Sequence, residues 1–224
     1  MREIRAVEDL LRLLDGLFTT DAAWWHKFYA DRSRPVPFFT PEPDENLVSY
    51  LDRGLLKPGR ALDVGCGAGR NALRLAEVGY TVTAVDLSAT AIAWAEERAG
   101  DIGIDFRCGD VFAVDGTYDL IYDSGCFHHL PPHRRISYLA LLDRTLAPGG
   151  HFALTCFTTD EGSSRLDADF YRNPVLDGGV GYTPESLRWI FADLHEVEIR
   201  PMRDDTEHFG VPFLWTGLWR KPRA

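Results

Sequence analysis

The residues best suited to chemistry lie around a glycine-rich turn that follows a short apolar run. The run at 61–64 contains Asp63, and Gly65, Gly67 and Gly69 follow it at alternate positions. A buried strand that ends in a tight glycine turn and continues into a helix is the usual opening of a nucleotide-binding unit. Glycine allows the sharp turn and lets a ligand approach the backbone. The segment therefore predicts a nucleotide-type binding site.

The spacing of this turn distinguishes among ligands. A dinucleotide-binding turn has the pattern G-x-G-x-x-G, but here Arg70 occupies the third glycine position and Gly69 comes one residue early. A phosphate-binding P-loop ends in Gly-Lys-Ser/Thr, and this turn does not. The carboxylate of Asp63 would repel a pyrophosphate and attract a cation. The pattern predicts a nucleoside-like ligand that carries a positive charge.

A second acid follows the next apolar run. Asp86 ends the strand-like segment 81–85, 17 residues after Gly69. In open parallel sheets, ligands bind at the carboxyl ends of the strands, where a carboxylate can accept hydrogen bonds from both ribose hydroxyls. The alternative is that Asp86 only caps a helix that starts near Ser88.

The order of predicted elements indicates an α/β protein with a parallel sheet and helices on both faces. Apolar runs predict strands at 60–64, 81–85, 103–107, 118–122 and 150–157. Helical spacing predicts helices at 69–78, 88–99, 133–146 and 183–191. Two further strand-like runs, 194–200 and 212–219, lack an intervening helix and predict a terminal hairpin. Residues 3–54 are expected to be helical, with a break at the proline-rich segment 35–43.

Together, these motifs resemble the class I S-adenosylmethionine-dependent methyltransferases. The family's first motif, D-V-G-C-G-x-G, matches residues 63–69, and Asp86, Asp110 and the segment 146–150 follow at the expected intervals. The likeness covers about residues 47–157 and is weaker beyond them. It implies a Rossmann-like, doubly wound sheet of seven strands in the order 3-2-1-4-5-7-6, with the seventh antiparallel. It also implies S-adenosylmethionine as cofactor and S-adenosylhomocysteine as product.

The resemblance also implies a division of the chain. Residues 1–45 are expected to form a helical, aromatic N-terminal lid. Residues 46–224 are expected to form the methyltransferase domain, with an insert at about 158–182 that shapes the acceptor pocket or is a disordered surface loop.

The cofactor site that the resemblance implies is built from the motif residues. In the family, an acid at the position of Asp110 binds the adenine amino group with Val111 against the ring, whereas Asp110 as a turn residue is the alternative. Asp63 is expected to face the methionine amino group, and Arg70 either lies near the methionine carboxylate or is a surface residue. The expected cofactor residues are Asp63, Gly65, Cys66, Gly67, Gly69, Arg70, Asp86, Leu87, Asp110, Val111, Asp123 and Ser124.

Three histidines are candidates for the catalytic group. Methyl transfer from a sulfonium is an in-line displacement in which the enzyme positions the nucleophile and, if necessary, removes a proton. His128 and His129 come directly after the strand at 118–122, and histidine titrates near neutral pH. His128 as base, His129 as a structural residue, and positioning without any base remain open. His208 is a third candidate or an exposed loop residue.

An aromatic cluster near the N-terminus is the expected acceptor wall. Its rings would exclude water from a bound cofactor and an apolar acceptor, or they would simply pack an extra helix on the sheet. The arrangement resembles small-molecule methyltransferases more than RNA or protein methylases. The expected substrate-binding residues are Trp24, Trp25, Tyr29, Phe38, Phe39 and Tyr182.

Composition restricts the classes of molecule that this protein is expected to bind. The chain has 224 residues, a net charge of −10 and a pI near 5.1. This charge argues against nucleic acid, which prefers a basic surface. No apolar run approaches membrane-spanning length, no signal peptide begins the chain, and no metal-ligand spacing or acidic metal triad appears in the sequence. The four cysteines are expected to be buried free thiols of a cytoplasmic protein.

We therefore expect a metal-independent enzyme that methylates O, N, S or C of a small metabolite, as a monomer or a homodimer. A thiol- or halide-type S-methyltransferase and an inactive S-adenosylmethionine-binding regulatory subunit are the alternatives. A nicotinamide dehydrogenase is disfavoured because Arg70 occupies the third glycine position.

Overall fold

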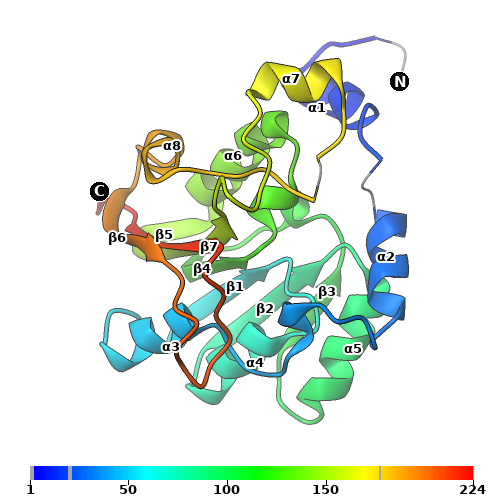
Figure 1. The fold of residues 1–224 in the computed structure, drawn as a ribbon. Coiled ribbons are helices and arrows are strands. Elements are labelled where there is room, and N and C mark those ends of the chain that lie inside the picture. The colour runs from blue at the N-terminus through cyan, green and yellow to red at the C-terminus, as the bar shows by residue number, and fades with distance from the viewer. Residues whose placement is uncertain (1–2, 20–21, 177, 224) are drawn as a thin grey trace.

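Seven strands form one mixed sheet in the computed structural model, which describes residues 3–19, 22–176 and 178–223 (Figure 1). The order β3-β2-β1-β4-β5-β7-β6 confirms the predicted topology. The first five strands are parallel, and β7 is antiparallel to both of its neighbours, β5 and β6. The strands are β1 Arg60–Val64, β2 Thr81–Asp86, β3 Asp105–Cys108, β4 Tyr118–Ser124, β5 Leu146–Phe157, β6 His195–Pro201 and β7 Leu214–Arg220.

Helices cover both faces of the sheet, as predicted (Figure 1). On one face, Leu47 and Leu75 belong to a buried cluster with Val82 of β2. On the other face, Leu141 and Leu187 belong to a second cluster with Phe152 of β5. The helices are α1 Val7–Asp15, α2 Ala22–Ala30, α3 Glu45–Asp52, α4 Arg70–Glu77, α5 Ala89–Ala99, α6 Arg135–Thr145, α7 Asp167–Arg172 and α8 Pro184–Ile190.

Local signals place the helices that adjoin the glycine turn. Gly69 adopts the left-handed conformation (φ 79°) and starts α4 immediately after the turn. The Ser88 hydroxyl accepts a hydrogen bond from the Ala91 N–H and caps α5. Both helices therefore begin at the carboxyl ends of their preceding strands, where a ligand is expected to bind.

Several predicted boundaries differ from the structure. The strand expected at 150–157 begins at Leu146, because Leu146 already pairs with Tyr118 of β4. The helix expected at 133–146 begins at Arg135, because Pro131 and Pro132 lead into a 3₁₀ turn at Pro132–Arg134. Cys108 was expected to be buried, but it is exposed because β3 is an edge strand with little cover. All four cysteines are free thiols.

The N-terminal segments pack on two different parts of the molecule. Helix α2 lies beside α5 (Figure 1), whereas α1 contacts the 3₁₀ turn Pro132–Arg134. Arg134 anchors α1 through ion pairs with Glu8 and Asp15. The described parts of the insert, 158–176 and 178–182, contain α7 and are joined by the bridge between Ser163 and Val180.

Candidate active site

The glycine turn after β1 has no room for side chains. Gly65, Gly67 and Gly69 all have positive φ values, of 64°, 53° and 79°. A Cβ atom on Gly67 would lie 2.6 Å from the Tyr29 hydroxyl, and one on Gly65 would lie 2.7 Å from Cβ of Cys126. These glycines are therefore needed both for the backbone conformation and for the close approach of neighbouring segments.

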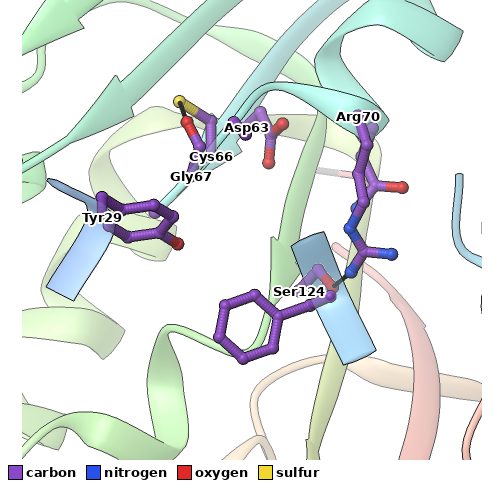
Figure 2. Close-up of a pocket in the computed structure, with 10 residues that line it drawn as sticks. Tyr29, Asp63, Cys66, Gly67, Arg70 and Ser124 are labelled. Atoms are coloured by element: carbon purple, nitrogen blue, oxygen red, sulfur yellow. Dashed lines mark hydrogen bonds between the residues drawn. The ribbon is translucent and has the colours of Figure 1, made fainter. Parts of the chain in front are cut away.

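A small cavity of about 30 Å³ lies between this turn and the N-terminal arm (Figure 2). Tyr29 bounds it on one side, and Arg70 and Ser124 lie across from it (Figure 2). The glycine motif and the N-terminal arm thus meet in one place, and the role of the arm as a lid stays a prediction. The lining residues are Tyr29, Phe38, Asp63, Gly65, Cys66, Gly67, Ala68, Arg70, Asn71 and Ser124.

Asp63 presents an unusual carboxylate to this cavity. Its side chain is 1% exposed, and its Oδ2 has no hydrogen-bond partner in the described part of the chain. Burial raises the pKa of Asp63 to about 8, and the nearby carboxylates of Asp44 and Asp123 add to the increase. A buried acceptor without a partner is costly. Its position is therefore suited to a cationic ligand group.

Arg70 provides a fixed positive charge on the same cavity. Its Nη2 donates a hydrogen bond of 2.9 Å to the Ser124 hydroxyl, and its Nη1 lies 2.5 Å from Oδ1 of Asp44. The Phe209 ring covers the guanidinium at 4.0 Å. Arg70 is buried, so the alternative of a surface residue is wrong.

Asp86 supports the turn from the end of β2. Its two carboxylate oxygens accept hydrogen bonds from the Gly67 N–H (2.9 Å) and the Ser88 N–H (2.8 Å). Burial raises the pKa of Asp86, while these two amides partly lower it. Each oxygen retains acceptor capacity. The ribose role of Asp86 stays a prediction, and its contact with the helix start is also present.

The residues expected around adenine follow β2 and β3 and do not line the cavity in the described structure. Leu87 is 42% exposed, Val111 is buried, and Asp110 is exposed. Asp110 Oδ1 accepts a hydrogen bond from the Phe112 N–H, as a turn residue does. An exposed Leu87 is available to cover a base, and the adenine contacts of Asp110 and Val111 stay predictions.

The two residues that end β4 have different surroundings. Ser124 lines the cavity and accepts from Arg70. Asp123 instead accepts hydrogen bonds from Cys126 N–H, Phe127 N–H and the Tyr138 hydroxyl. Burial raises the pKa of Asp123 to about 7, although these hydrogen bonds lower it. The side chain of Asp123 therefore shapes the following loop and does not line the cavity.

His128 and His129 form a buried pair. The Nδ1 of His128 accepts a hydrogen bond from the Phe157 N–H at 3.3 Å, and its Nε2 lies 3.1 Å from Nε2 of His129. Burial holds the pKa of His128 well below its usual value and lowers the pKa of His129 to about 4. Both rings are neutral at pH 7, and both ring nitrogens of His128 have partners. The contacts favour a structural role, and the base role of His128 stays a prediction.

His208 and Tyr182 do not line the cavity in the described structure. His208 is half-exposed, with Nδ1 3.9 Å from Glu42 Oε2. The Tyr182 hydroxyl accepts from Arg135 Nε at 3.1 Å, and its ring packs on Phe127. Tyr182 is therefore part of the core beneath the insert, although the sequence predicted a place in the acceptor wall.

The aromatic residues of the arm do gather near the cavity. Tyr29 and Phe38 line it directly, and Phe39 stacks on Tyr29 with centroids 5.5 Å apart. The Trp25 ring contacts the His129 ring edge-on, with centroids 4.9 Å apart. Trp25 also contacts the Trp24 ring edge-on, with centroids 4.7 Å apart. The arm therefore connects the glycine turn with the histidine pair.

Two residues at the site were not predicted. Asn71 lines the cavity, and its Oδ1 accepts a hydrogen bond from the Asp44 N–H at 2.9 Å. Asp44 pairs with Arg70 across 26 positions of the sequence. Asn71 follows the glycine motif and was a foreseeable candidate, whereas no sequence signal marks Asp44.

Within the described ranges, no group of three or more histidine, cysteine, aspartate or glutamate side chains is placed to hold a metal ion. Nor does any described helix have the length and apolar character needed to span a bilayer.

Comparisons with known proteins identify a methyltransferase domain in this chain. A family model described as a methyltransferase domain matches residues 61–150. The 2-heptyl-1-hydroxyquinolin-4(1H)-one methyltransferase of Mycobacteroides abscessus is 32% identical over 131 residues, which are 56% of this chain and 57% of that enzyme. The 27-O-demethylrifamycin SV methyltransferase of Amycolatopsis mediterranei is 28% identical over 85% of this chain and 71% of that enzyme. The chain thus spans little more than half the length of the first of these relatives.

A solved structure shares the fold along nearly the whole chain. The 1,6-didemethyltoxoflavin-N1-methyltransferase of Burkholderia thailandensis, with bound 1,6-didemethyltoxoflavin and S-adenosylhomocysteine, gives a TM-score of 0.62. It is 22% identical, and the match covers 99% of this chain and 93% of that chain. Residues 61–150 therefore match a methyltransferase domain, and the sheet has the strand order that the resemblance to the class I S-adenosylmethionine-dependent methyltransferases implies.

Proposed function

We propose that this protein binds S-adenosylmethionine at the carboxyl ends of β1, β2 and β4 and transfers its methyl group directly to a small metabolite. The observation that carries the proposal is that a carboxyl group and a separate cation line one cavity. Asp63 offers a buried carboxyl oxygen without a hydrogen-bond partner in the described residues, and Arg70 offers a fixed cation on the same cavity. The methionine end of the cofactor carries the complementary ammonium and carboxylate.

The residues present fit this cofactor. Asp63 Oδ2 is an unpaired acceptor for the ammonium, and Arg70 and Ser124 can donate to the carboxylate. The bare backbone at Gly65 and Gly67 allows close approach of the nucleoside. Asp86 and Leu87 continue the site along β2 toward the ribose and the base.

When bound, S-adenosylmethionine supplies a methyl group on a positively charged sulfur that is open to in-line displacement. The protein's part is to orient the cofactor and the acceptor and to keep water out. Tyr29, Phe38 and the neighbouring arm rings supply the cover. Both histidines are neutral and hydrogen-bonded, so positioning carries most of the proposed catalysis.

The proposed acceptor is a small metabolite that offers O, N, S or C. The quinolone and rifamycin methyltransferases among the relatives act on small molecules, and the arm of this chain presents an aromatic wall. The acidic pI supports a small acceptor over nucleic acid.

Incubation of the purified protein with S-adenosylmethionine and metabolite pools tests this function. We expect a product that is heavier than its precursor by one CH₂ unit, and by the trideuterated equivalent when the donor methyl is labelled. Reactions without protein are the control. Binding of S-adenosylhomocysteine with no methylated product from any pool would favour the inactive regulatory alternative and contradict the proposed activity.

A further inference from the structure

A buried carboxyl group and a buried guanidinium line one small cavity without pairing with each other. Asp63 Oδ2 has no hydrogen-bond partner in the described residues, although Arg70 borders the same cavity. A direct contact with Arg70 would favour the ionised form of Asp63, and the two charges would then attract strongly because the effective dielectric constant of a buried site is low. A direct Arg70–Asp63 pair would occupy both groups that a zwitterionic ligand needs. Another residue must therefore hold Arg70 in place.

Asp44 is that residue. It is fully buried, and its Oδ1 lies 2.5 Å from Nη1 of Arg70. Its Oδ2 accepts hydrogen bonds from the hydroxyls of Tyr122 at 2.7 Å and Thr155 at 3.3 Å. Tyr122 in turn accepts from Asn46 at 3.2 Å. Side chains of β4 and β5 thus hold the Asp44 carboxylate in place.

The backbone around Asp44 is fixed as well. Its N–H donates to Asn71 of α4 at 2.9 Å. Glu45 N–H donates to the Phe209 carbonyl at 2.9 Å, and Phe209 N–H donates to the Pro43 carbonyl at the same distance. The Phe209 ring then covers the Arg70 guanidinium. The segment before α3 and the loop between β6 and β7 together enclose the Asp44–Arg70 pair.

We propose that Asp44 is a positioning residue that holds Arg70 away from Asp63, so that one cavity offers a separate cation and a separate carboxylate to the zwitterionic end of the cofactor. This inference rests on the proposed cofactor. It extends the site to a residue outside the matched methyltransferase domain at 61–150.

The test compares two ligands by calorimetry in wild type and Asp44→Asn. S-adenosylhomocysteine carries the amino-acid end, whereas 5′-methylthioadenosine shares the adenosine and thioether but lacks that end. In Asp44→Asn, Arg70 is free to pair with Asp63. We expect S-adenosylhomocysteine to bind about 10- to 100-fold more weakly, the range for lost charged hydrogen bonds, and methylthioadenosine to bind within about twofold of wild type.

A double variant shows whether Asp44 acts through Arg70. In an Arg70→Met background, where no buried cation needs a partner, Asp44→Asn should not weaken S-adenosylhomocysteine binding further. If Asp44→Asn does not fold cooperatively, Tyr122→Phe removes one hydrogen bond to Asp44 and should weaken the same ligand by about two- to fivefold.

The outcomes separate this inference from the function it rests on. Unchanged or tighter S-adenosylhomocysteine binding by Asp44→Asn, or an equal loss for both ligands in a folded variant, would overturn the positioning role alone. Failure of the wild-type protein to bind either ligand would overturn the proposed function instead.

Discussion

At the scale of single residues, Asp63 combines complete burial with a side-chain oxygen that has no partner in the described structure. Native proteins satisfy most buried polar groups, and exceptions occur where a ligand completes the bonding. The neighbouring Asp86 and Asp123 are also buried, yet their oxygens accept hydrogen bonds from the backbone. Asp63 is therefore the carboxylate best placed to receive a cation.

The raised pKa of Asp63 gives a pH dependence of stability. Its pKa is about 8 in the folded protein and near 3.8 in an unfolded chain. The folded state binds this proton more tightly, so the stabilisation is complete below about pH 4 and is lost as pH rises toward 8. We expect Asp63→Asn to flatten the decrease in thermal stability of the free protein between about pH 5 and pH 8, measured by unfolding scans.

The comparison with Asp63→Asn is necessary because Asp123, with a pKa of about 7, titrates in an overlapping range. The variant removes only the contribution of Asp63. Identical pH profiles for wild type and variant would show that Asp63 is ionised throughout and would contradict its proposed protonation.

Residue roles were predictable where a local motif fixed them. Asp63, Gly67 and Arg70 were found from the glycine motif because the motif itself forms the turn. Asp44 was not, because its partners Arg70 and Tyr122 come from distant parts of the chain. The position of Tyr182 in the insert predicted a place in the acceptor wall. In the structure its side chain packs against Phe127 and lies in the core.

At the scale of elements, the histidine pair connects β5, the loop after β4 and the insert. Phe157 N–H donates to His128 Nδ1, and Nε2 of His128 lies 3.1 Å from Nε2 of His129. The Val180 N–H donates to the His128 carbonyl at 2.7 Å. This chain of contacts holds the insert against the sheet, next to Trp25 of the arm.

We expect His128→Ala to lower the free energy of unfolding by about 2–4 kcal/mol, the range for emptying a buried side-chain site. Urea denaturation measures this change. His208→Ala removes a half-exposed histidine and serves as the control, with an expected change within about 0.5 kcal/mol. A His128→Ala protein as stable as wild type, but with strongly reduced turnover, would restore the role of His128 as catalytic base.

Elements with strong periodicity were predicted well, and their ends less well. The strand order follows from the βαβ alternation and the family resemblance, and each predicted strand of the sheet is present. The start of α6 was predicted too early because two prolines first form a 3₁₀ turn. The start of β5 was predicted too late because Pro148 and the two glycines after it resemble a loop. The path of the insert depends on contacts with His128 that no local pattern reveals.

At the scale of the whole molecule, two apolar clusters hold helices against the sheet, and the cavity lies where β1 and β4 end. The arm reaches this site from outside the matched domain and supplies Tyr29 and Phe38. Cofactor binding and coverage by the arm should therefore occur in the same place. The central claim is that this place binds an adenosyl sulfonium and not a dinucleotide.

Calorimetric titration with S-adenosylhomocysteine tests that claim most directly. We predict saturable binding of one ligand per chain to the wild-type protein and no binding of NAD. Asp86→Ala should weaken the binding by about 1–3 kcal/mol, because a charged acceptor is lost, whereas the surface variant Asp101→Ala should bind as wild type does. Saturable binding of NAD with no heat from S-adenosylhomocysteine, or an Asp86→Ala protein with unchanged affinity, would contradict the account.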